Sequence, residues 1–330
     1  MGRKRKTTRL AAASPDSVAE AAQSLRAGGL VAMPTETVYG LAADATSDQA
    51  VAAIYAAKER PAINPLIAHV LSLEAAREHA VFEPAAEKLA IRFWPGPLTL
   101  VLPAAPTCRI SLLARAGLDT VALRVPSHET ARALIEAAGV PLAAPSANRS
   151  GRVSPTTAAH VAADLDGRID WILDGGPCRH GLESTIVEVA GGRIVLLRPG
   201  AIARQAIESA LGSPVELGQG SRGKPNAPGQ LASHYAPNAE LRLGAVDARA
   251  DEVALDFAGS LKESAARARL DLSPSGDLVE AAANLFSHLR ALDAGGAARI
   301  AVAPIPGHGL GAAINDRLRR AAAPRTGRAP

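Results

Sequence analysis

The chain is poor in cysteine, which excludes several kinds of site. Its 330 residues include only Cys108 and Cys178, which stand far apart without C-x-x-C or Cys/His spacing. A structural zinc site is therefore not expected, and zinc is not expected as a cofactor. With no disulfide framework in the pattern, a reducing cytoplasm is the expected setting.

Long apolar runs are also missing. Charged residues or prolines interrupt every hydrophobic stretch, so no segment is expected to cross a bilayer and no membrane contact is expected. The first ten residues, MGRKRKTTRL, lack the apolar core of a secretory signal. The chain is thus expected to be an ordinary globular protein, long enough for two domains.

Aromatic residues make up only 3% of the chain, and basic charge gathers at one end. Without the five basic residues of the first nine positions, the rest of the chain is nearly neutral. A near-neutral body with few aromatics disfavours a nucleic-acid-binding module. Residues 1–13 are expected to form a disordered basic tail, with at most a weak grip on phosphate backbones such as that of tRNA.

The rest of the chain alternates helix and strand patterns, which predicts a layered α/β architecture. Residues 14–211 would form one domain with a mixed sheet, because two strands joined by Gly191-Gly192 predict a hairpin. Residues 212–238 are rich in Gly and Pro and read as a linker. Residues 239–330 would form a smaller, Rossmann-like α/β domain.

The patterns also place the individual elements. Helices are expected at 14–27, 47–57, 73–80, 83–93, 127–138, 155–165, 202–211, around 261–270, and at 277–294 and 311–322. Strands of the first domain are expected at 30–33, 66–70, 98–102, 121–125, 142–144, 171–173, 185–189 and 194–197. In the second domain the segments LRL, VALDF and ARIAVAPIP are expected to be strands.

Four polar motifs lie at the predicted strand ends: PTETVYG, KERPAINPL, APSANRSG and GLESTIV. Strand ends are where α/β proteins build ligand sites, so their side chains are expected to converge. The candidates are Thr37, Lys58, Arg60, His69, Arg124, Ser146, Asn148, Ser184 and Arg198. Hydroxyls and cations without a cysteine nucleophile or a phosphate-binding GxxxxGK[ST] loop suit a polyanionic ligand and electrostatic catalysis.

Single residues in this set also have purely structural explanations. Ser154 before Pro155 is a helix N-cap pattern, and a helix N-terminus also attracts anions. His69 could be an ordinary strand histidine. Glu36 and Glu183 stand beside hydroxyls and could act as acid or base or organise hydrogen bonds.

Taken in order, PTETVYGL, K-x-RP-x-x-NPL-x-x-H, ALRVP, PSAN-x-SG, STIV and RPG resemble the YrdC-like family over residues 14–240. HYAP after a linker, followed by a second small domain, resembles the long two-domain form of L-threonylcarbamoyladenylate synthase. The resemblance implies that N-carboxythreonine, formed from threonine and bicarbonate or CO2, attacks the α-phosphate of ATP. Pyrophosphate leaves, and threonylcarbamoyl-AMP passes to a transferase complex that modifies the adenosine beside the tRNA anticodon.

The resemblance also implies residue roles. Lys58 and Arg60 would be catalytic, with Mg2+ on the phosphates of ATP. Threonine would be bound by Thr37, His69, Arg124, Ala144 and Ser184. ATP would be bound by Arg60, Asn64, Thr120, Ser146, Ser154, Arg198 and Tyr235, with Tyr235 closing over the nucleotide as a lid.

Two positions depart from the family pattern. Glu59 stands where glycine is common and is expected to point away from the site, and Gln230 stands in the linker where an apolar residue is usual. Other activities remain open from the sequence. A nucleotide or threonine sensor would bind the same ligands without releasing pyrophosphate, and an RNA-binding module would need no catalysis. A carbamoyl transferase of hydrogenase maturation would need C-x-x-C motifs that this chain lacks.

Overall fold

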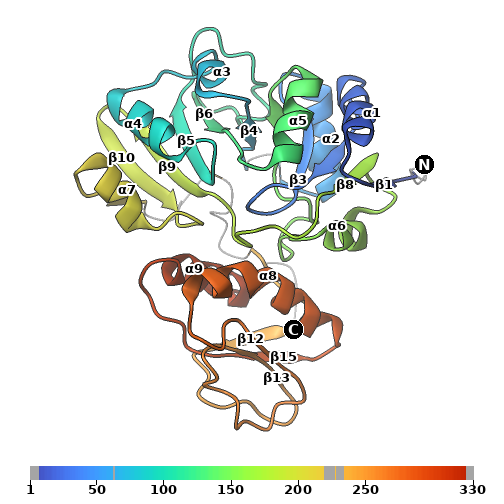
Figure 1. Cartoon of the computed structure of the whole chain (residues 1–330), viewed down its shortest axis with the longest axis vertical. Coiled ribbons are helices and arrows are strands. Elements are labelled where there is room, and N and C mark those ends of the chain that lie inside the picture. Colours follow the sequence, from blue (N-terminus) through green and yellow to red (C-terminus); the bar gives the residue numbers. More distant parts are fainter. Residues whose placement is uncertain (1–6, 62–63, 219–226, 228–233, 325–330) are drawn as a thin grey trace.

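The computed structural model describes residues 7–61, 64–218, 227 and 234–324. Within these residues the chain forms an eleven-stranded and a four-stranded sheet, each covered by helices (Figure 1). The strands of the first sheet are β1 (Arg9–Ala12), β2 (Val31–Met33), β3 (Gly40–Asp44), β4 (Ile67–His69), β5 (Leu98–Pro103), β6 (Thr120–Arg124), β7 (Leu142–Ala143), β8 (Trp171–Asp174), β9 (Thr185–Ala190), β10 (Arg193–Arg198) and β11 (Glu216–Leu217). The second sheet contains β12 (Glu240–Leu243), β13 (Val253–Asp256), β14 (Arg269–Asp271) and β15 (Arg299–Val302).

Seven helices in the described residues accompany the first sheet: α1 (Pro15–Arg26), α2 (Asp48–Lys58), α3 (Leu73–Arg77), α4 (Pro84–Phe93), α5 (Glu129–Ala138), α6 (Ala158–Leu165) and α7 (Arg204–Leu211). Apolar side chains of α1 and α5 form one core against the sheet, and those of α2, α4, α6 and α7 belong to a second core. The first domain is therefore a sheet covered on both faces, as the alternating pattern predicts.

The order of the first sheet is β1-β8-β2-β3-β7-β4-β6-β5-β9-β10-β11, with both parallel and antiparallel pairs. The mixed sheet and the hairpin of β9 and β10 are confirmed. Gly191 and Gly192 have φ of 59° and 74°, the left-handed values that a two-residue hairpin turn requires. The main-chain N–H groups of both donate to the Glu83 carboxylate, which anchors the turn to the start of α4.

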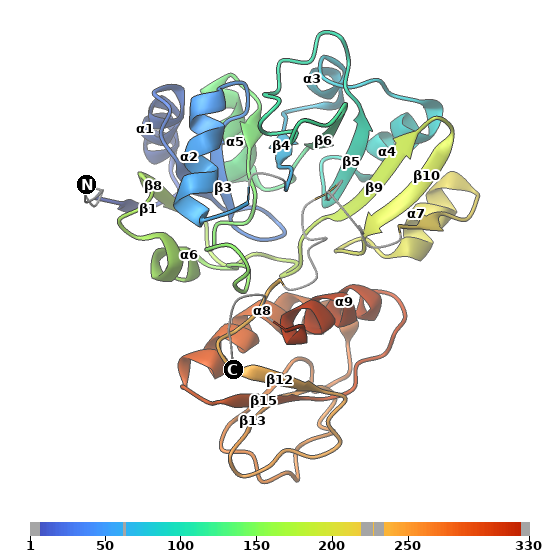
Figure 2. The same ribbon diagram turned by 180° about the vertical axis from the view of Figure 1, so that it is seen from behind.

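The second sheet has the order β12-β15-β13-β14, and all of its neighbours are parallel. Helices α8 (Leu278–Ala294) and α9 (Gly311–Ala322) lie between this sheet and the first domain (Figures 1 and 2). The core of this domain also takes in Val38, Val153, Leu182 and Tyr235 from outside it. The apolar core thus continues across the boundary between the two sheets, which joins the domains through packed side chains.

Two sequence predictions are wrong. Residues 9–12 are not part of a disordered tail but form β1, which pairs with β8 and places the Arg9 guanidinium 4.2 Å from the centre of the Trp171 ring. The helix expected around 261–270 is instead a turn followed by β14. The Asp256 carboxylate accepts the N–H groups of Phe257 and Leu261 there, which favours a turn, and pairing with β13 then overrides helix propensity.

Strands β3 and β11 were also not anticipated. Residues 40–44 read GLAAD, and glycine and alanine have weak strand preference, so the strand exists because β2 and β7 pair with it on both sides. Residues 1–6 and Gln230 lie outside the described residues. No helix among the described residues is long and apolar enough to span a membrane.

Candidate active site

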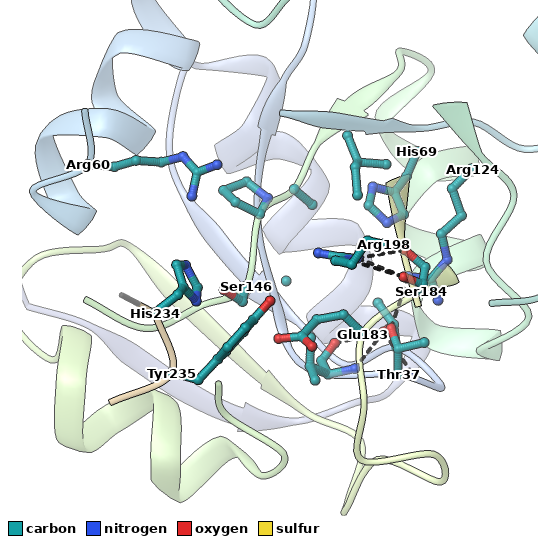
Figure 3. A pocket seen from close by; sticks show the side chains of 16 residues that line it. Thr37, Arg60, His69, Arg124, Ser146, Glu183, Ser184, Arg198, His234 and Tyr235 are labelled. Carbon is teal, nitrogen blue, oxygen red and sulfur yellow. Dashed lines mark hydrogen bonds between the residues drawn. The ribbon is translucent and has the colours of Figure 1, made fainter. Parts of the chain in front are cut away.

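A cavity of about 50 Å³ lies where the predicted motifs meet (Figure 3). Nine of the residues expected at the site line it: Thr37, Arg60, His69, Arg124, Ala144, Ser146, Ser184, Arg198 and Tyr235. They come from several strand ends and from the segment that follows the linker. The convergence predicted from the strand-end pattern is therefore present in the fold.

Arg124 stands at one end of the cavity, on the last residue of β6. Its Nη1 donates to Thr37 Oγ1 at 2.9 Å, its Nη2 donates to Glu36 Oε1 at 2.6 Å, and its Nε donates to the Gly96 carbonyl at 3.3 Å. Arg124 is 4% exposed, so this geometry is held without competition from water. A guanidinium has five N–H groups, so within the described residues one on each Nη remains for a ligand carboxylate.

Glu36 is the buried counterion of Arg124. Burial alone would raise the pKa of its carboxyl, but the charge and hydrogen bond of Arg124 hold it below its ordinary value. Glu36 is therefore an anion at neutral pH. Its Oε2 has no hydrogen-bond partner in the described residues, and it neutralises Arg124 from outside the cavity lining.

His69 lies at the end of β4, beside Arg124 in the parallel register of the two strands. Burial and the nearby charge of Arg124 lower the pKa of His69 to about 3. The imidazole is therefore neutral at physiological pH. Its Nδ1 is buried without a hydrogen-bond partner among the described residues, so a polar ligand in the cavity would satisfy it.

Arg60 and Arg198 also supply positive charge to the cavity lining. Burial, with the nearby charge of Arg198, lowers the pKa of Arg60 to about 10, which still leaves a cation. Arg60 Nη2 donates to the Pro65 carbonyl at 3.2 Å, so the guanidinium braces its own loop. Arg198 Nη2 donates to the Ser184 carbonyl at 2.8 Å and to Ser184 Oγ at 3.1 Å. Two buried arginines facing one cavity favour an anionic ligand.

Five predicted residues do not line the cavity: Lys58, Asn64, Thr120, Asn148 and Ser154. The Lys58 amine donates instead to the main-chain carbonyls of Ser146 and Asn148. Burial and the charge of Arg60 lower the pKa of Lys58 well below its ordinary value. Thr120 begins β6 and is only half-buried, and both amide atoms of Asn64 are buried without a partner in the described residues.

Ser154 does not cap a helix, because α6 begins at Ala158 and Thr157 caps it. Its Oγ donates to Glu183 Oε1 at 2.6 Å, and Ser154 is fully buried. Glu59 ends α2 with φ of 55°, a left-handed value that accounts for the glycine common at this position. As expected, its carboxylate points to solvent and pairs there with Arg149 and Arg168.

Tyr235 and His234 close the cavity from the side of the second domain. The Tyr235 ring points toward the middle of the cavity in Figure 3 and stacks on Phe286 of α8, with ring centres 5.6 Å apart. The main-chain N–H of His234 donates to the main-chain carbonyl of Arg320 at 3.2 Å. The cavity of about 50 Å³ has room for a few water molecules and is partly open, so a nucleotide beside Tyr235 would extend beyond it.

Sequence reasoning missed several residues of the site. His234 lines the cavity, and its only signal was adjacency to Tyr235 in the HYAP segment. Glu183, which the sequence offered as an acid, a base or a hydrogen-bond organiser, also lines the cavity. Thr35 also lines it and bonds Thr37, with the two Oγ1 atoms 2.8 Å apart. No group of three or more His, Cys, Asp or Glu residues that could hold a metal ion occurs in the described part of the chain.

Comparison with known proteins extends over both domains. A family model described as "Telomere recombination" matches residues 23–200, and one described as "Threonylcarbamoyl-AMP synthase, C-terminal domain" matches residues 202–323. The threonylcarbamoyl-AMP synthase of Bacillus subtilis is 41% identical over 333 residues, which cover 92% of each chain. That of Pyrococcus abyssi is 44% identical over 319 residues, covering 91% of this chain and 92% of that one.

Solved structures agree with these matches. The crystal structure of P. abyssi Sua5 complexed with L-threonine superposes with a TM-score of 0.86 at 40% identity, covering 96% of this chain and 97% of that chain. A variant of the same protein, with one histidine and one tyrosine replaced by alanine, gives a TM-score of 0.85 at 37% identity and covers 96% of each chain. From the two family models and these full-length relatives, the chain belongs to the two-domain Sua5-type family of threonylcarbamoyl-AMP synthases.

Proposed function

We propose that this protein makes threonylcarbamoyl-AMP and pyrophosphate from L-threonine, bicarbonate or CO2, and ATP. Family membership supports the reaction, and the cavity supports it for this chain. Buried arginines, hydroxyls and a neutral histidine from separate motifs line one cavity. The product would pass to a tRNA threonylcarbamoyl transferase complex in the cytoplasm, with at most a weak tRNA contact by the enzyme itself.

Threonine would bind at the Arg124 end. The two free N–H groups of Arg124 suit the carboxylate of the amino acid. Neutral His69 would hydrogen-bond a polar group of threonine without adding charge. Thr37, Ser184 and the main chain at Ala144 would complete the subsite.

ATP would bind beside Arg60 and Arg198, with Asn64, Thr120, Ser146, Ser154 and Tyr235, and Arg198 would border the threonine subsite through Ser184. Attack of a carboxylate on a phosphate brings two anions together, and their repulsion amounts to several kcal/mol unless cations offset it. Arg60 and Arg198 would supply this charge. Lys58 would hold the Ser146–Asn148 segment that shapes the subsite.

Magnesium would accompany ATP as a ligand of its phosphates and would neutralise part of their charge. Among the described residues the cavity lining offers one carboxylate, Glu183, and both of its oxygens already accept hydrogen bonds. The protein therefore fits a metal carried in by the nucleotide rather than one held by a set of side chains.

Pyrophosphate release from ATP by the purified protein tests the proposal, with threonine and bicarbonate each present or omitted. Release that requires both, and fails with serine or alanine, supports the synthase. Release without threonine would indicate another adenylation or hydrolysis. Binding of ATP and threonine with no release would indicate a sensor.

A further inference from the structure

Arg317 lies on α9 in the second domain and is 0% exposed. Its Nε donates to Glu183 Oε2 at 2.8 Å, across the boundary between the two domains. Its Nη1 donates to Asp316 Oδ2 at 2.8 Å. A buried arginine bonded on two sides is held in one orientation, so it can serve as a fixed point for its neighbours.

Glu183 connects Arg317 to the proposed nucleotide subsite. One carboxylate oxygen accepts from Arg317 and the other accepts from Ser154 Oγ at 2.6 Å, so the three side chains form one continuous chain of hydrogen bonds. Burial alone would raise the pKa of Glu183, but the charges of Arg317 and Arg198 hold it below its ordinary value. Glu183 is an anion that lines the cavity and depends on Arg317 for its counterion.

The ring of Tyr235 contacts the same arginine. The guanidinium carbon of Arg317 lies 5.2 Å from the centre of the Tyr235 ring, within the range of a cation–π contact. Arg317 Nη2 has no hydrogen-bond partner among the described residues. Tyr235 has φ of 62°, an unfavourable value for tyrosine, so neighbouring contacts must hold it there. Phe286 and Arg317, both from the second domain, make such contacts.

We propose that Arg317 is a positioning residue that holds Tyr235 over the cavity and Glu183 against Ser154, so that the second domain sets the affinity for ATP. This inference rests on the proposed function, because it assigns ATP to the space under Tyr235. Arg317 touches neither threonine nor the reacting atoms in this scheme. It acts through the two side chains that it fixes.

The test measures binding of a non-hydrolysable ATP analogue to four proteins: wild type, Arg317→Met, Tyr235→Ala and the double variant. Methionine keeps much of the length of arginine and removes its charge and donors. We expect Arg317→Met to weaken binding about tenfold, a typical coupling between linked sites. If Arg317 acts partly through Tyr235, the double variant should bind less weakly than the product of the two single effects, and any remaining loss relative to Tyr235→Ala would report the route through Glu183. Single effects that multiply in the double variant would overturn the proposal.

Arg242→Met is the matched control. Arg242 also belongs to the second domain and donates to both oxygens of the buried Glu252 carboxylate, but it contacts neither Glu183 nor Tyr235. We expect it to lower thermal stability and to leave analogue binding unchanged. Equal weakening by Arg242→Met would mean that Arg317 only stabilises the domain, and would overturn the proposal.

Arg317→Lys keeps the test decisive if Arg317→Met does not fold. Lysine retains the charge near Glu183 and loses the planar group that faces Tyr235, so intermediate affinity is expected. Wild-type affinity in Arg317→Lys would contradict the positioning role. Wild-type protein that binds the analogue but releases no pyrophosphate would refute the synthase activity, and the binding comparison would still decide the role of Arg317.

Discussion

The Lys58 amine lies 2.5 Å from the main-chain carbonyl oxygen of Asn148 and also donates to that of Ser146. The last residue of α2 thereby holds the segment that forms one wall of the cavity. This contact changes the expected role of Lys58, because the amine is directed at the main chain and does not line the cavity. Its influence on the reaction would pass through the position of Ser146.

Replacing Lys58 with alanine should lower turnover more than it raises the KM for ATP. We expect kcat to fall about 100-fold, because loss of the amine releases the Ser146–Asn148 main chain and misplaces the groups that line the cavity. Steady-state pyrophosphate release at varied ATP measures both constants. Lys88→Ala is the control, because Lys88 also donates to a main-chain carbonyl, that of Leu211, at the exposed surface. A rise in KM with unchanged kcat would contradict this role.

Arg124→Lys should raise the KM for threonine about tenfold, because lysine cannot present the two parallel N–H groups that bind a carboxylate. The KM for ATP should change little. Initial rates at varied threonine measure the effect. Arg77→Lys serves as the control, since Arg77 pairs with Glu87 at the surface. An equal change in both KM values would show that Arg124 does not recognise threonine in particular.

Tyr235→Ala should weaken ATP binding about tenfold and shorten the lifetime of the product in the site, because a large aromatic contact is removed and water can enter. Tyr235→Phe retains the ring and should behave like wild type in ATP binding. Equilibrium binding and the rate of product hydrolysis are the measurements. Unchanged values in Tyr235→Ala would mean that the HYAP segment is only a linker.

Acid should destabilise the fold through its neutral histidines. Burial lowers the pKa of His69 and His234 to about 3 each, whereas the unfolded chain binds these protons near pH 6.5. Between pH 6.5 and 3 the unfolded state binds more protons. The contribution of the two histidines to the free energy of unfolding is therefore complete above pH 6.5. As the pH falls below 6.5, the free energy of unfolding decreases by about 1.4 kcal/mol per pH unit for each histidine.

Urea unfolding at pH 7.5, 6.0 and 5.0 measures this loss. His69→Gln removes one titrating group and should lose less free energy of unfolding over the same pH interval. Exposed His308 provides the control, and His308→Gln should leave the pH dependence unchanged. A His69→Gln slope equal to that of wild type would refute the buried neutral state of His69.

The positions of the motifs could be predicted because each motif lies at the end of a strand. The apolar pattern that indicates a strand depends only on residues close together in the sequence. Thr37, His69, Arg124 and Ser184 were expected to meet on this ground, and they line one cavity. Strand β1 could not be anticipated, since residues 9–12 carry no apolar alternation and owe their order to pairing with β8. The turn before β14 depends likewise on the Asp256 carboxylate and on pairing with β13.

By itself the sequence determined the family of this protein, its two α/β domains and most of the residues around its cavity, because motifs and periodicity are properties of neighbouring residues. Only the tertiary structure decided the direction of the Lys58 amine and the contact of Arg317 with Glu183 and Tyr235. Arg317 stands 134 residues from Glu183, in a helix that reads as an ordinary charged surface. Packing of the two domains buries Arg317, and the buried guanidinium then contacts two residues of the site.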